Sequence, residues 1–192
     1  MYYQIKPEGF KFKEFSLDPY EIVDLFPDEY TLPQIINFYQ HNFKMGKYWK
    51  APKGEFVQIK QMPEGDIPDL AQWLGGSLVL SPNAFSVLKQ PLLVLGELLP
   101  IHLEGTTYYL FNCLTIAQHD EINSRKEQVD DDGKVSTEAK LSINSTHLSD
   151  KLVFKTKFNN YSRLYCSEKF KQLIVSNKLS GLTFDEDLTN IF

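Results

Sequence analysis

The sequence contains few cysteines and no long apolar run. Cys113 and Cys166 are the only two cysteines in 192 residues. A small secreted domain held together by disulfides uses more of them, so the composition predicts a reducing compartment. The longest apolar candidate, 91–103, is interrupted by charged and turn-forming residues. It is shorter than the roughly 20 residues that cross a bilayer, and the N-terminus lacks the apolar centre of a secretory signal. We therefore expect a soluble cytoplasmic protein with no membrane contact.

Positive charge is also scarce. Lysine and arginine number 20 against 25 aspartates and glutamates, which gives a formal net charge of -5. Proteins that bind nucleic acid usually present a basic face, so this balance argues against nucleic acid as a partner and fits a basic protein partner. The hydrophobic fraction of 42% indicates a globular chain rather than a disordered one. Its length predicts a single domain, 1–192.

Motifs for metal, phosphate and serine-hydrolase chemistry are missing from the sequence. It contains no His-Glu-x-x-His, no Cys-x-x-Cys pair, no phosphate-binding glycine loop and no Gly-x-Ser-x-Gly. The run of aspartates before Gly133 resembles a calcium loop, but the twelfth position holds Ala139 in place of the bidentate glutamate. An Asp-Gly hairpin turn in a solvent loop is the better interpretation. We predict no cofactor and no metal.

Cys166 is the one residue for which covalent catalysis needs to be weighed. It precedes Ser167 and Glu168 at the start of a predicted helix, a position that lowers a thiol pKa. A nucleophilic cysteine also needs a base, and none of the four histidines lies in a cysteine-hydrolase signature. We interpret Cys166 as a buried strand residue and Ser167 as the N-cap of the helix. A cysteine-dependent hydrolase remains the alternative.

Capping patterns predict that the N-terminal part is the more helical one. An acceptor residue followed by proline, with Glu or Gln three residues after the cap, marks helix starts at Asp18 and Thr31. These signals predict helices over 18–26 and 31–43. A third short helix is expected over 66–74, ending at the two glycines that follow. The result would be a helical subregion, 1–65, ahead of a core, 66–192.

The second half shows strand patterns. A strand before Ser81 should lead into a helix capped by that serine. Two strands should flank Glu104 and Gly105, and the second has apolar residues on both faces, which predicts a central strand. The segment 164–184 reads as strand, helix, turn and strand. The predicted fold class is α+β, with a mixed or antiparallel sheet flanked by short amphipathic helices.

Several segments together resemble a bacterial immunity-protein family of polymorphic-toxin systems, family eleven, formerly a domain of unknown function. They are "MYYQIKP" at the start, "DLAQWLGGSLVLSPNAFSVL", "YYLFNCLTIAQHDEINS" and "LYCSEKFKQLIVSNKLSGLTF". The resemblance covers most of the chain from Ile67 onward and the extreme N-terminus. It implies a non-enzymatic antidote that binds a cognate toxin and blocks it in the producing cell. The family supplies no catalytic residues.

An antidote of this kind would be helped by acidic residues, because they steer a basic toxin toward it. Two acidic runs are candidates for toxin binding, and they also read as simple solubility features. They consist of Asp130, Asp131, Asp132, Asp185, Glu186 and Asp187. A third hypothesis is a small-ligand or scaffold protein unrelated to toxins, which the neighbouring genes would distinguish.

Overall fold

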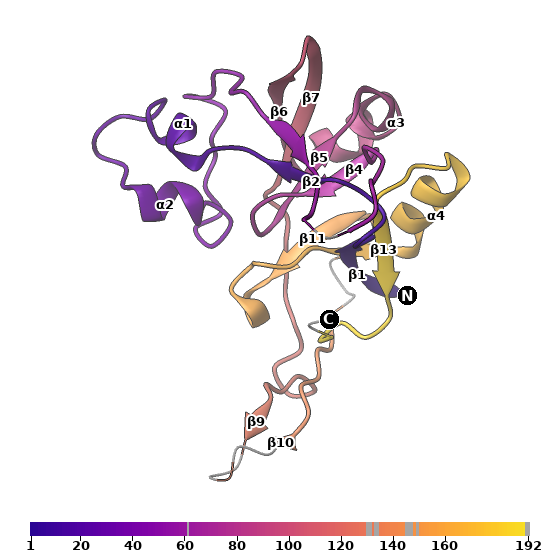
Figure 1. The fold of residues 1–192 in the computed structure, drawn as a ribbon. Coiled ribbons are helices and arrows are strands. Elements are labelled where there is room, and N and C mark those ends of the chain that lie inside the picture. Colours follow the sequence, from indigo (N-terminus) through magenta and orange to yellow (C-terminus); the bar gives the residue numbers. More distant parts are fainter. Residues whose placement is uncertain (61, 130–131, 133–134, 145–147, 149, 191–192) are drawn as a thin grey trace.

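A computed structural model of the chain contains two main β-sheets with helices beside them (Figure 1). The residues it describes are 1–60, 62–129, 132, 135–144, 148 and 150–190. The α+β class and the sheet flanked by short helices are confirmed. Among the described residues, no helix combines the length and the apolar character that a membrane span requires.

The first sheet has five strands in the order β13-β1-β12-β11-β8. Their bounds are β1 Tyr2–Pro7, β8 Ile116–Ala117, β11 Val153–Thr156, β12 Tyr165–Ser167 and β13 Leu182–Asp185. All neighbours are antiparallel except β11 and β8. The N-terminal strand β1 therefore lies between two strands from the C-terminal part of the chain. A short 3-10 helix, η2 (Lys157–Asn159), follows β11.

The second sheet has four antiparallel strands in the order β4-β5-β7-β6. Their bounds are β4 Leu70–Gln72, β5 Ser77–Leu80, β6 Gly96–Leu103 and β7 Thr106–Cys113. The predicted hairpin around Glu104 is confirmed, and so is the central position of β7. Phe111 and Cys113 pack on one face of this sheet, and Leu110 packs on the other. Both faces are buried, as a central strand with two apolar faces requires.

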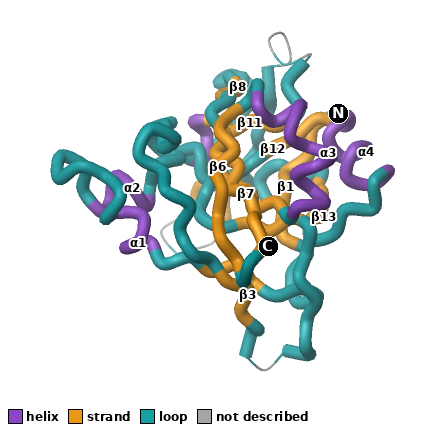
Figure 2. Tube along the Cα trace, turned by 90° about the horizontal axis from the view of Figure 1, so that it is seen from above, coloured by secondary structure: helices purple, strands orange, loops and turns teal. Residues whose placement is uncertain are grey.

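The largest apolar cluster includes residues from both sheets and from helices α3 and α4. Figure 2 shows these two helices next to each other. Helix α3 (Pro82–Leu93) begins at Ser81, whose hydroxyl accepts a hydrogen bond from the Ala84 amide at 3.1 Å. Helix α4 (Glu168–Ser176) buries Phe170 and Ile174, four residues apart, on its inner face. Both helices were predicted from their serine starts and their periodicity.

The N-terminal part packs on the other face of the four-stranded sheet, in a second cluster. Its elements are β2 Glu14–Ser16, α1 Pro19–Val23, α2 Leu32–Ile36 and β3 Glu55–Val57. The prediction of a more helical N-terminus is wrong, because α1 and α2 have five residues each while α3 has 12. Helix α2 ends where the Asn37 side chain donates to the Pro33 carbonyl, a local bond that competes with helix continuation.

The helix predicted over 66–74 is also wrong, because this segment forms strand β4. Leu70 packs into the cluster between the sheets and Ala71 into the cluster on the opposite face. An extended chain buries successive residues on opposite faces, whereas a helix cannot. Pairing of β4 with β5 therefore overrides the local capping signal.

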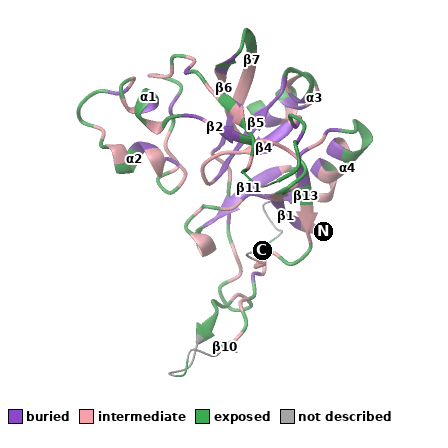
Figure 3. Ribbon diagram, in the orientation of Figure 1, coloured by how far each residue is buried: buried purple, intermediate pink, exposed green. Residues whose placement is uncertain are grey.

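A slender arm formed by β9 (Gln128–Val129) and β10 (Val135–Thr137) projects from the body (Figure 1). Burial is concentrated in the two sheets and their inner faces, whereas the described arm residues are exposed or half-buried (Figure 3). The predicted solvent loop is thus a hairpin. A smaller apolar cluster near its base includes Leu141, Phe154 and Tyr165.

Candidate functional site

Cys166 is completely buried on β12, within the cluster between the sheets. Burial raises the pKa of its thiol far above the ordinary value, and the nearby Lys171 lowers it only in part. Burial likewise raises the pKa of Cys113 to about 11. A nucleophilic cysteine needs a thiolate that a substrate can reach. Both cysteines therefore have the properties of core residues.

Ser167 does not form the cap that its sequence position predicts. Its hydroxyl makes no hydrogen bond to the first turn of α4, and its buried oxygen has no hydrogen-bond partner among the described residues. The backbone amide of Ser167 donates instead to the Leu152 carbonyl at 3.0 Å, as part of sheet pairing. Glu168 lies in the first turn of α4, where a carboxylate interacts favourably with the helix dipole, as expected. Its carboxylate also accepts a hydrogen bond from the Tyr3 hydroxyl.

Lys155 on β11 is the only lysine among the buried polar side chains of the described residues. Its ammonium donates to the Tyr39 carbonyl at 2.8 Å and lies 5.9 Å from the centre of the Tyr161 ring. Burial lowers its pKa to about 8. The side chain ties the loop after α2 to the five-stranded sheet. Because it has no solvent exposure, it is a tether rather than a group that a substrate can reach.

The predicted C-terminal acidic run lies at the end of β13, and two of its three members stabilise local structure. Asp185 accepts from the Lys6 ammonium at 2.7 Å, and this hydrogen bond is the main reason that its pKa lies below the usual range. Asp187 accepts from the Thr189 hydroxyl at 2.7 Å, and its pKa is lowered for the same kind of reason. Glu186 lies between them and is exposed.

The predicted loop run is only partly described. Asp132 is exposed between the strands of the arm, whereas Asp130 and Asp131 lie outside the described residues. The C-terminal segment contacts the base of the arm, because the Thr189 hydroxyl donates to the Ala139 carbonyl at 3.3 Å. The described residues contain no group of three or more His, Cys, Asp or Glu that could hold a metal ion.

A further acidic segment was not predicted from the sequence. The segment 14–43 has no lysine or arginine, and all six of its carboxylate residues are exposed. They are Glu14, Asp18, Glu21, Asp24, Asp28 and Glu29. No ion pair to any of them occurs among the described residues. The signal was present in the sequence as a long interval between Lys13 and Lys44, but the overall charge balance concealed it. Exposed carboxylates of this kind favour encounter with a basic partner.

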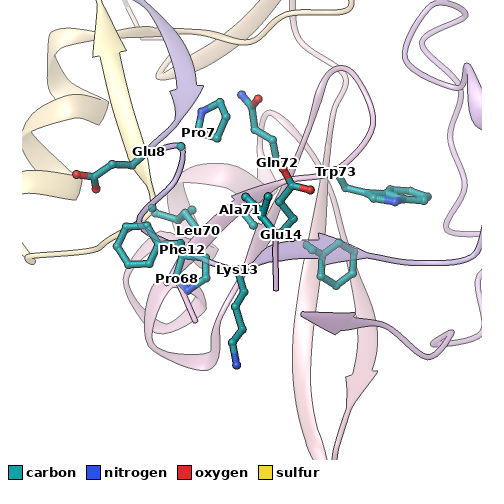
Figure 4. Close-up of a pocket in the computed structure, with 14 residues that line it drawn as sticks. Pro7, Glu8, Phe12, Lys13, Glu14, Pro68, Leu70, Ala71, Gln72 and Trp73 are labelled. Atoms are coloured by element: carbon teal, nitrogen blue, oxygen red, sulfur yellow. The ribbon is translucent and has the colours of Figure 1, made fainter. Parts of the chain in front are cut away.

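A groove at one end of this acidic segment lies between the chain that follows β1 and the strand β4 (Figure 4). Its volume is about 360 Å³. The lining combines aromatic and aliphatic side chains with Glu14 and Gln72. No sequence pattern indicates this groove, because it forms only where β1 and β4, which are far apart in the chain, meet in space.

Residues 101–188 match the model of an immunity protein family (Imm11). The resemblance inferred from the sequence is thereby confirmed over this range, which begins later than the Ile67 expected. The range extends from within β6 to just beyond β13 and includes the arm and the C-terminal acidic run. No curated protein matches the chain. The match is to a family of immunity proteins, and it therefore suggests a role in toxin neutralisation.

Proposed function

We propose that this protein is an immunity protein that binds a cognate bacterial toxin directly and blocks it in the cytoplasm of the producing cell. The observation that carries the proposal is the match of residues 101–188 to the immunity protein family. The burial of both cysteines supports a role in binding rather than covalent chemistry. The toxin would be a secreted effector, such as one delivered by type VI secretion, that is used against competing bacteria.

Neutralisation of a toxin requires fast association and slow dissociation. The exposed carboxylates would speed association with a toxin that has a basic surface, because opposite charge raises the encounter rate at low ionic strength. We assign this steering role to Asp130, Asp131 and Asp132, between β9 and β10 in the sequence, and to Asp185, Glu186 and Asp187 at the end of β13. Glu186 is the free member of the second run, since Asp185 and Asp187 also hold the C-terminal segment.

The test is a rescue assay in a heterologous bacterium that expresses the toxin gene adjacent to this one. Co-expression of the wild-type protein should restore growth, and the two proteins should co-purify. The Cys166→Ser variant should protect as well as the wild type, because the thiol takes no part in binding. Loss of protection by a Cys166→Ser protein that still folds would favour the hydrolase instead. Absence of a toxin gene nearby, with no rescue of any candidate toxin, would contradict the proposal.

A further inference from the structure

The groove beside β4 lies where the end of β1, in the five-stranded sheet, meets β4, at the edge of the four-stranded sheet. Its floor and walls come from the end of β1, the connection to β2, strand β4 and the turn before β13. The lining residues include Gly9, Phe12, Glu14, Pro68, Gln72 and Gly181. Its volume of about 360 Å³ can take one or two amino-acid side chains together with their backbone.

Strand β4 forms an outer edge of the four-stranded sheet, and this edge faces the groove. In an antiparallel sheet, successive residues direct their backbone groups alternately to the two sides. The Ser81 amide donates to the Asp69 carbonyl, so Asp69 faces β5. The Leu70 amide donates to the Ser180 carbonyl on the opposite side. Gln72 is two residues further along, so its N–H and C=O also face away from β5.

No backbone partner of Gln72 occurs on that side among the described residues. The other edge of the same sheet is covered, because the backbone groups of His102 on β6 exchange hydrogen bonds with Pro52 and Gly54. An uncovered strand edge is a site to which an extended segment of another chain can add. The sheet therefore has one edge that is covered at His102 and one that is paired with Ser180 at Leu70 but open at Gln72, next to the groove.

The charge around the groove is negative where the edge is open. In Figure 4 the Glu14 carboxylate is directed toward Gln72, whereas the Lys13 side chain points away from them. The described residues provide no ion pair to this carboxylate. Glu14 is also the first residue of the segment 14–43, which lacks lysine and arginine. The carboxylate is thus available to a cationic side chain.

An exposed aromatic residue stands next to the groove. Phe10 has 67% of its surface exposed and a φ of 68°, in the left-handed region that a phenylalanine rarely adopts. It follows Gly9, which lines the groove. Strained backbone and exposed aromatic rings are both common at binding sites.

We propose that this groove receives an extended segment of the cognate toxin that carries a lysine or arginine next to an apolar residue. The segment would pair its backbone with Gln72, place its apolar side chain in the groove and its cation against Glu14. This inference rests on the proposed function and names the surface. Gly181 is the one lining residue within the range 101–188.

The first test changes Gly9 in the full-length protein. A Cβ atom at Gly9 meets nothing within 4 Å, and the φ of Gly9 lies outside the left-handed region, so a side chain there should be tolerated. Gly9→Trp should obstruct the groove, and Gly9→Ala is the matched control that leaves it open. Binding to the catalytically inactivated product of the adjacent toxin gene is measured by surface plasmon resonance. We expect about a tenfold or greater rise in Kd for Gly9→Trp and little change for Gly9→Ala.

The second test removes the open backbone donor. Gln72→Pro lacks the N–H that faces the groove but leaves the bonds of β4 to β5, as proline on a strand edge permits. Gln72→Ala is its control, because it loses the same side chain, whose amide donates to the Ile5 carbonyl, and keeps the N–H. Gln72→Pro should therefore bind the toxin more weakly than Gln72→Ala does. The comparison requires that the two variants have similar melting temperatures.

The outcomes separate the two proposals. A wild-type protein that neither binds nor protects against the adjacent toxin contradicts the immunity function itself. A wild type that binds, with Gly9→Trp and Gln72→Pro binding equally well, overturns the groove and leaves the function intact. A wild-type dimer that Gly9→Trp converts into a monomer would assign the groove to a second copy of this chain, which also overturns the inference.

Discussion

Substitution of Lys155 by methionine tests the most unusual charge in the core. Methionine has a similar length and no charge, so it should fit between Tyr39 and the Tyr161 ring. The ammonium of Lys155 has one hydrogen bond, to the Tyr39 carbonyl, and no salt bridge to it occurs among the described residues. Burial lowers its pKa from 10.5 to about 8, which means that the folded protein disfavours the charged form.

The magnitude follows from linkage between protonation and folding. In the unfolded chain Lys155 keeps its proton up to about pH 10.5, whereas in the folded protein it loses it near pH 8. The unfolded state therefore binds more protons in this interval, so the contribution of Lys155 to stability becomes more favourable as pH rises. Between about pH 7 and about pH 9.5 the change is about 2 kcal/mol.

The assay is urea unfolding of the wild type and Lys155→Met across this pH range. The quantity of interest is the difference between their unfolding free energies, because the raised pKa of the buried Cys166 thiol opposes the trend in both proteins and cancels in the difference. The Cys113 thiol cancels only in part, because the charge of Lys155 lowers its pKa in the wild type alone. The wild type should gain about 2 kcal/mol relative to the variant from about pH 7 to about pH 9.5. At neutral pH the two should lie within about 2 kcal/mol, because loss of the buried charge offsets the loss of a partner for the Tyr39 carbonyl.

Lys157→Met is the matched control, because Lys157 lies two residues away and is exposed. Its difference from the wild type is measured over the same interval. A pH-independent difference for Lys155→Met would refute the reasoning, because it would mean that the Lys155 ammonium is not desolvated in the folded protein.

Three other outcomes are expected. Ser167→Ala should leave the free energy of unfolding unchanged or raise it by up to about 1 kcal/mol, because the buried hydroxyl lacks a partner; a loss of about 1 kcal/mol in urea unfolding would restore the cap interpretation. Asp69→Ala should cost about 2 kcal/mol, because Asp69 accepts from Ser81, Asn83 and Ser180. Burial acts to raise the pKa of Asp69, but these bonds lower it overall. The Asp69→Ala difference should therefore shrink below about pH 4 in acid titrations, as the wild type also loses its carboxylate. Charge reversal of Asp130, Asp131 and Asp132 should slow association with the toxin at low salt; an unchanged association rate would remove the arm from the interface.

The sequence predicts elements well where local signals and tertiary pairing agree. Helix α3 combines a serine cap, proline at its first position and a buried face, and all three occur in the structure. The hairpin of β6 and β7 follows from alternating apolar residues around a tight turn. Strand β4 shows the opposite case, because its cap-like start and apolar spacing fit a helix until β5 offers a pairing edge.

The candidate surfaces depend on long-range contacts in the same way. The acidic runs are visible in the sequence, but the cations and hydroxyls that bind them are not. Lys6, which donates a hydrogen bond to Asp185, is 179 residues away from it in the chain. The hydroxyl of Ser167 fits a cap in the sequence, yet sheet pairing of its backbone places it out of reach of the helix amides. The groove needs the end of β1 and the edge of β4 to meet, and no local pattern encodes that contact.

The N-terminal strand links these surfaces to the range that matches the family. Strands β12 and β13 do not pair with each other, because β1 lies between them and pairs with both. The same strand supplies Lys6 to Asp185 at 2.7 Å, and its Gln4 accepts from Arg163 at 3.2 Å, close to the bonds that Arg163 makes to the C-terminal segment. Residues 101–188 alone would therefore lack the central partner of their own sheet. They would also lack the cation that holds the C-terminal acidic run. The same β1 ends at the groove beside β4. Correct formation of both proposed contact surfaces thus depends on a strand at the opposite end of the chain from most of the residues that identify the family.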